Sequence, residues 1–151
     1  MWARLRRFKA LPLPARALFL RAALLLPLIA VCLRLRGFRS TQRLLQNFLT
    51  PAKDIPAAAA AESRVVMTSR MVLAAARNSP IRSTCLERSL ALWWLLAKQS
   101  IATQFRIGVR KDGEKFAAHA WVEHDGVAIG EPEASHLHYT VFAEEMFVDA
   151  S

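Results

Sequence analysis

The sequence predicts an α+β protein in which a helical N-terminal part packs on a small core of one further helix and an antiparallel sheet. Up to Lys98, apolar residues recur mainly at helical spacing. After Lys98 the period falls to two, and Phe105, Ile107 and Val109 alternate with Arg and Gly. Two Asp-Gly pairs then separate alternating runs, which is typical of β-hairpins.

Length and composition indicate one folded domain. A chain of 151 residues is large enough to bury its own core. A hydrophobic content of 54% with four Trp argues against disorder. The two cysteines do not make a disulfide framework, so we expect a reducing, cytoplasmic setting.

Charge is distributed unevenly along the chain. The net charge is +9, and residues 1–53 carry eleven Lys or Arg and no acidic residue. We therefore divide the chain into basic, apolar helices over 1–56 and a core over 57–151, together expected to form one compact unit. The asymmetry indicates an anionic partner or surface. The basic residues are interleaved with Leu rather than with stacking aromatics, so we expect no nucleic acid.

The run "ALFLRAALLLPLIAVCLRLRGFRS" resembles a membrane span but is too short. Its longest uncharged stretch, Ala22–Leu33, has twelve residues and contains Pro27, whereas a span needs about 20 apolar residues. A secretory signal is disfavoured because Val31 is bulky at the would-be cleavage box and a second basic cluster follows. We predict a buried or surface-docking helix, with Cys32 as a small apolar residue inside it. A peripheral membrane contact stays open.

Two more helices are expected before the core. "STQRLLQNFL" predicts a short helix with Ser40 or Thr41 as its cap. After a turn over residues 50–56, "AAAAAESRVVMTSRMVLAAAR" predicts a long helix that ends at Asn78, Ser79 and Pro80.

The stretch "RSTCLERSLALWWLL" places one of the cysteines at the start of an apolar helix. Thr84 and Glu87 form the pattern T-x-x-E, a capping box that puts Cys85 in the first helical turn. Unpaired N–H groups there stabilise a thiolate and can receive an oxyanion during acyl transfer. These residues alone leave two readings open, an activated nucleophile and a structural thiol.

The predicted hairpins carry a histidine and acidic residues that could belong to a catalytic site. In "FAAHAWVEH", His119 shares one strand face with Glu123. If the loop at Asp125-Gly126 has three residues, His119 faces Glu131 on the next strand, and the carboxylate would orient the imidazole. With a two-residue turn, Pro132 takes that place. Glu123 is the second-choice orienter.

A metal site is the remaining alternative in this region. His136 and His138 could share one strand face, but no Cys or acid spacing completes a ligand set. We expect neither a metal nor a cofactor.

At these residues the sequence resembles a known family. "STCLERSLALWWLLAKQSIATQFRIGVRK" followed by "FAAHAWVEHDGVAIGE" is similar to the transglutaminase-like core of lasso-peptide leader peptidases, over about residues 79–131. The resemblance implies a papain/transglutaminase-type core with Cys85 as nucleophile, His119 as general base and acid, and Glu131 as the orienting acid. Many relatives have Asp where this chain has Glu131.

The resemblance also implies a reaction and partners. The reaction would be cysteine-peptidase hydrolysis of the bond between leader and core of a ribosomally made precursor peptide. In stand-alone members a small leader-binding protein presents the precursor, and an asparagine-synthetase-like lasso cyclase then closes the ring. Two alternatives remain. One is a transglutaminase-like acyltransferase using a Lys amine in place of water, and the other is a non-catalytic membrane- or partner-binding adaptor built on residues 1–53.

Overall fold

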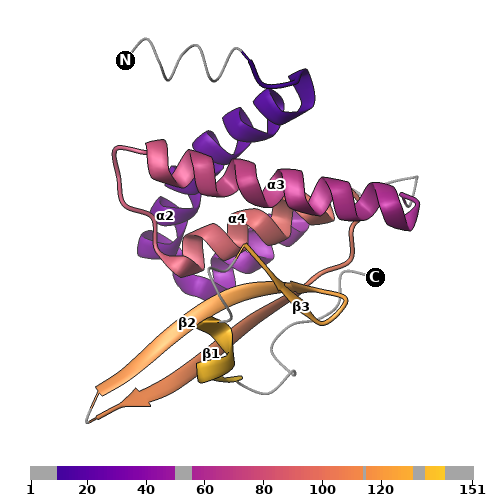
Figure 1. The fold of residues 1–151 in the computed structure, drawn as a ribbon. Coiled ribbons are helices and arrows are strands. Elements are labelled where there is room, and N and C mark those ends of the chain that lie inside the picture. Colours follow the sequence, from indigo (N-terminus) through magenta and orange to yellow (C-terminus); the bar gives the residue numbers. More distant parts are fainter. Residues whose placement is uncertain (1–9, 50–55, 114, 131–134, 142–151) are drawn as a thin grey trace.

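The computed structural model describes residues 10–49, 56–113, 115–130 and 135–141. It confirms the predicted α+β class, with a layer of helices on one side of a small antiparallel sheet (Figure 1). The elements in chain order are α2 (Leu13–Asn47), α3 (Ala58–Asn78), α4 (Cys85–Ala97), β1 (Gln104–Asp112), β2 (Lys115–His124), β3 (Val127–Ile129), the 3-10 helix η1 (Ser135–His138) and β4 (Thr140–Val141).

Helix α2 joins the apolar run and the segment predicted as a separate short helix. The two parts meet at Gly37, whose φ of 74° and ψ of 178° are not helical. Glycine adopts this left-handed φ without the steric cost of a Cβ. The predicted cap at Ser40 or Thr41 is therefore wrong, because the break comes at Gly37. Thr41 is buried and its hydroxyl donates to the carbonyl of Gly37 at 2.8 Å.

Helix α3 ends where the sequence predicted. Its last residue is Asn78, and Ser79 is already extended with a ψ of 139°. The residue before a proline is driven out of the helical region, so Pro80 explains this end. The loop that follows leads directly into α4.

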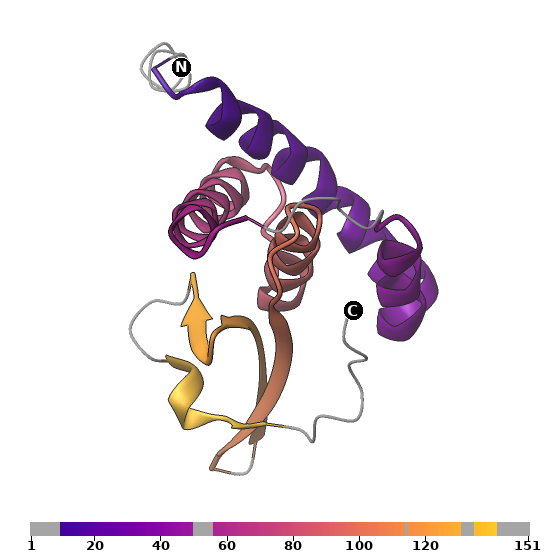
Figure 2. The ribbon, with the colours of Figure 1, turned by 90° about the vertical axis from the view of Figure 1, so that its right-hand side faces the viewer.

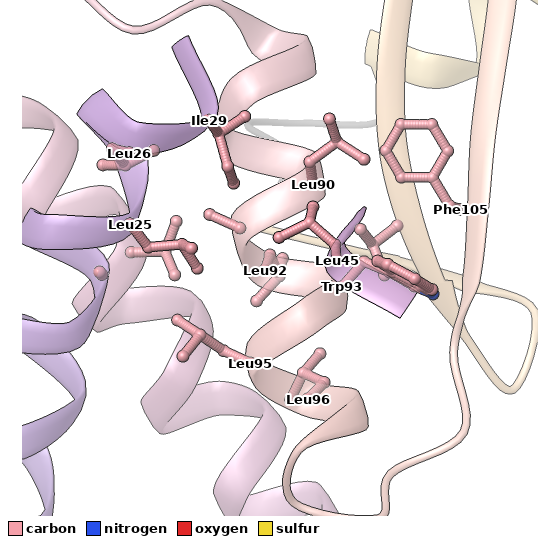
Figure 3. Close-up of a cluster of buried hydrophobic side chains, with 14 of the residues drawn as sticks. Leu25, Leu26, Ile29, Leu45, Leu90, Leu92, Trp93, Leu95, Leu96 and Phe105 are labelled. Atoms are coloured by element: carbon pink, nitrogen blue, oxygen red, sulfur yellow. The ribbon is translucent and has the colours of Figure 1, made fainter. Parts of the chain in front are cut away.

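One hydrophobic core joins the three helices to the sheet. Helix α4 is its centre (Figure 3), and Leu90, Trp93 and Leu96 are among its buried residues. Full burial of such a side chain stabilises the fold by about 1.5–3 kcal/mol. The remaining labelled members come from α2, α4 and β1: Leu25, Leu26, Ile29, Leu45, Leu92, Leu95 and Phe105.

The sheet has the strand order β3-β2-β1-β4, and every pair is antiparallel. In the second hairpin Asp125 and Gly126 both have positive φ, 50° and 77°, and His124 pairs with Val127. Of the two loops that the sequence left open, the structure has the two-residue turn, and Glu123 therefore faces Ala128 and not Val127. Two positive φ values make a type I′ turn, whose twist matches that of the flanking strands.

By length and composition, α2 is the one helix of the described residues that could cross a membrane. Of its most apolar window, 33% is buried inside the protein. Core helices of soluble proteins and signal sequences meet the same criteria, so this property alone assigns no location.

Candidate active site

Cys85 lies at the first position of α4, as the T-x-x-E pattern predicted. The hydroxyl of Thr84 accepts from the backbone N–H of Glu87 at 3.3 Å. In return, the backbone N–H of Thr84 donates to Glu87 Oε2 at 2.8 Å. The capping box is thus complete, and it holds the thiol of Cys85 at the helix N-terminus.

The same box decides which amides remain for a ligand. A helix begins with four N–H groups that have no intrahelical acceptor. The amides of Thr84 and Glu87 are bonded within the box. The amides of Cys85 and Leu86 remain, directly beside the sulfur. They are suitably placed to donate to an oxygen that gains negative charge there.

A buried hydrogen bond ties α4 to the strand that carries the histidine. Ser89 lies one turn after Cys85, on the same face of the helix. Its hydroxyl donates to the carbonyl of Ala120 at 2.8 Å, and only 6% of Ser89 is exposed. Because Ala120 follows His119 in β2, this bond brings the strand of the histidine to the N-terminal half of α4.

Cys85 and His119 line one cavity of about 640 Å³. Its wall is formed by α3, by the loop before α4 and α4 itself, and by residues of β2, β3 and the position after β3. No residue of α2 lines it. The fold therefore unites two residues that are 34 positions apart in the sequence. Both residues are only partly buried.

Aromatic rings surround His119. Its ring centroid lies 6.0 Å from that of Trp121 in a stacked arrangement and 5.2 Å from that of Tyr139. Gly108 pairs with His119 across the β1–β2 ladder. A Cβ at Gly108 would lie 2.8 Å from Cβ of Tyr139 and 2.9 Å from the ring of Trp121. The glycine therefore makes room for the rings that hold the imidazole.

Glu123 has other partners than His119. Its Oε1 accepts from Trp121 Nε1 at 2.8 Å, and its Oε2 accepts from Arg106 Nε at 3.1 Å. It also lies four positions along β2 from His119, a distance of about 13 Å. The structure thus assigns Glu123 to the support of Trp121 and removes it as the second-choice orienter.

Glu131, His136 and His138 are the remaining candidates. Position 131 lies outside the described residues, so the role expected for Glu131 stays a prediction. Pro132, the partner of His119 in the alternative with a two-residue turn, also lies outside the described residues. His136 and His138 lie in the 3-10 helix η1 and not on a strand as expected. Within the described part of the chain, no three His, Cys, Asp or Glu residues gather as metal ligands.

Sequence reasoning missed Ser89 and Tyr139. Ser89 had a signal, because a polar residue four positions after Cys85 on an apolar helix lies on the nucleophile's face. Tyr139 had none, because it reaches His119 only through the pairing of β4 with β1.

The arrangement defines a class of protein. A cysteine at a helix N-terminus and a strand histidine on one cavity are typical of cysteine proteases and related acyltransferases. The sequence model of the transglutaminase-like superfamily matches residues 23–144, and the chain belongs to that superfamily. Comparisons with curated proteins and with solved structures found no match.

Proposed function

We propose that this chain is a cysteine peptidase that removes the leader from a ribosomally made lasso-peptide precursor. The observation that carries the proposal is the shared cavity of Cys85 and His119, with the sulfur at a capped helix N-terminus. Membership in the transglutaminase-like superfamily supports thiol chemistry. The resemblance of the C-L-E-R and H-A-W-V-E segments to leader peptidases supports the finer assignment.

The proposed reaction has two steps. The thiolate of Cys85 attacks the scissile carbonyl, and the amides of Cys85 and Leu86 donate to the resulting oxyanion. His119 protonates the leaving amine, which departs as the N-terminus of the core peptide, while the leader stays as a thioester. His119 then takes a proton from water, whose oxygen attacks the thioester and releases the leader carboxylate. Glu131 is the proposed orienting acid.

The partners are part of the proposal. A separate small leader-binding protein would present the precursor, and an asparagine-synthetase-like lasso cyclase would use the released core. If a Lys amine replaced water in the second step, the same residues would perform acyl transfer. The proposal commits to water, and the products distinguish the two reactions.

The test combines the purified chain with a cognate precursor and its leader-binding protein, with product masses read by mass spectrometry. We expect free leader and core from the wild type and from Cys32→Ala, because Cys32 lies in α2 away from the cavity. We expect no product from Cys85→Ala. Retained cleavage by Cys85→Ala would refute the mechanism. A leader–Lys adduct in place of free leader would establish acyl transfer instead.

A second candidate function is supported by the outer face of α2. Helix α2 runs along the outer edge of the helical layer (Figure 2), and it exposes apolar residues opposite its buried face. These residues follow one another at helical spacing and form one stripe: Leu13, Leu20, Leu24, Leu28, Val31 and Leu35. At 1.5 Å per residue the stripe is about 33 Å long.

The charged residues near this stripe indicate the kind of surface that it would contact. Arg21 and Arg34 are exposed on its two sides, and residues 1–53 contain no acidic residue. An apolar stripe flanked by arginines is typical of helices that lie in the surface of an anionic membrane. Because the opposite face of α2 packs in the core, the helix would lie along the membrane and not cross it. We propose this contact for the cytoplasmic membrane face.

Vesicle co-sedimentation tests the membrane contact. The wild type is expected to bind vesicles that contain phosphatidylserine and to release them in high salt. Leu24→Glu should abolish binding, whereas Phe116→Glu should not. Leu24 and Phe116 are both 75% exposed, but Phe116 lies in β2 away from the stripe. Equal binding by both variants, or stripe-dependent binding to the cyclase without any binding to vesicles, would refute the membrane contact.

A further inference from the structure

The cavity that holds Cys85 is positively charged on its described wall. Arg77, Arg82 and Arg88 line it, and no acidic residue is among the lining residues of the described segments. Glu87, the acid nearest to Cys85 in the sequence, is only 8% exposed, and its carboxylate is bonded to the amide of Thr84. The described part of the wall therefore carries three positively charged side chains and no negatively charged one.

The three arginines reach the cavity from three different segments. Arg77 belongs to the last turn of α3, Arg82 to the loop three residues before Cys85, and Arg88 to α4 one turn after Cys85. The positive end of the α4 dipole adds to their field. An anionic group in this cavity would thus be attracted toward the N-terminus of α4, which Cys85 begins.

Five aliphatic residues and three serines make up most of the rest of the wall. Its aliphatic residues come from α3, α4 and β3 and are Val72, Leu73, Ala76, Leu92 and Ile129. A purely hydrophilic anion such as free phosphate would leave this surface without contacts. A peptide segment with an apolar and an acidic side chain would match both parts of the wall.

We propose that the cavity selects a peptide with an acidic side chain beside an apolar one, next to the bond that Cys85 attacks. This inference rests on the proposed peptidase function and adds its substrate preference. The guanidinium groups bind the carboxylate through charge-assisted hydrogen bonds, for which the forked geometry of Arg is suited. The preference follows from residues around the nucleophile and does not depend on the leader-binding protein.

The field at Cys85 can be measured without any substrate. Iodoacetate and iodoacetamide both alkylate a thiolate: a sulfur–carbon bond forms, the carbon–iodine bond breaks and iodide leaves. Only iodoacetate is anionic. In the Cys32→Ala background, the rate ratio of iodoacetate to iodoacetamide at Cys85 should fall about three- to tenfold when Arg77, Arg82 and Arg88 are all changed to Gln.

Matched controls make the result specific. Arg64→Gln and Arg70→Gln change exposed arginines of α3 that do not line the cavity, so they should leave the ratio unchanged. Raising the salt should lower the wild-type ratio, because exposed charges are screened. A ratio that is the same in the triple variant and the wild type, or a Cys85 that resists both reagents, would overturn the proposal.

Peptide substrates then separate this inference from the proposed function. We compare a cognate precursor with variants in which each acidic residue near the cleavage site is changed to its amide. Each peptide is tested with a free and with an amidated C-terminus. The inference is supported if one acid-to-amide change in the precursor lowers kcat/KM about tenfold with the wild-type enzyme and does not lower it with the triple arginine variant. An effect of C-terminal amidation alone would overturn it. If no precursor is cleaved, the peptidase function fails while the alkylation ratio still tests the charged wall.

Discussion

The bond between Ser89 and Ala120 allows a sharp test of how the site is assembled. Ser89→Ala deletes a buried donor that bonds the carbonyl of Ala120 at 2.8 Å. The net loss of such a bond is about 1 kcal/mol, and a buried acceptor left unpaired raises the cost to about 1–3 kcal/mol. For a chain of this size, a loss of 2 kcal/mol corresponds to a fall in Tm of about 4–8 °C.

Ser69→Ala is the matched control. Ser69 and Ser89 are each 6% exposed and line the same cavity, Ser69 from α3 and Ser89 from α4. Within the segments that the structure describes, the side chain of Ser69 makes no hydrogen bond. We expect Ser69→Ala to change the free energy of unfolding by less than about 0.5 kcal/mol. Urea unfolding followed by Trp fluorescence measures both variants.

Kinetics separate positioning from stability. Because Ser89 holds β2 against α4, Ser89→Ala should lower kcat of precursor cleavage while KM stays unchanged, measured well below the new Tm. The alkylation rate of Cys85 should stay near that of the wild type, since the capping box is intact. If Ser89→Ala and Ser69→Ala agree in stability and in kcat, the bond does not position His119 and the reasoning is refuted.

Three other predictions concern the elements around the site. Thr84→Ala should cost about 1 kcal/mol of stability and slow alkylation of Cys85, whereas Thr84→Ser, which keeps the cap, should do neither. Gly108→Ala should destabilise by about 1–3 kcal/mol through overpacking against Tyr139 and Trp121, and it should reduce cleavage. Gly113→Ala is the control: a Cβ there meets nothing within 4 Å, so this variant should keep cleavage despite the backbone strain of a φ of 63°. Cleavage that is lost in Gly113→Ala and kept in Gly108→Ala would contradict the packing account. In the wild type, iodoacetamide should modify Cys85 before Cys32, as peptide mapping would show, because only Cys85 combines a helix N-terminus with an open cavity.

Much of the local structure could be predicted because its causes lie within a few residues. The T-x-x-E pattern predicted the start of α4, since both bonds of the box join Thr84 to Glu87. The end of α3 followed from the steric effect of Pro80 on its neighbour. The change of hydrophobic period after Lys98 predicted the switch from helix to sheet.

Two features could not be decided from the sequence, because the signals suit more than one structure. Asp125-Gly126 suits both a two-residue and a three-residue loop, and the structure has the two-residue form. The difference of one residue decides which side chain opposes which across the strands. At the other end, Ser40 and Thr41 are good caps by residue type, but the left-handed backbone of Gly37 sets the break in α2.

The amino-acid sequence by itself determined the fold class, the capped helix that begins at Cys85 and the strand that carries His119. These features depend on hydrophobic period and on contacts between residues at most four apart. Only the tertiary structure decided that the two residues share a cavity, that Ser89 joins their elements, and that three arginines line the wall. Such contacts join residues from different helices and strands, and their geometry depends on how the whole core packs around α4.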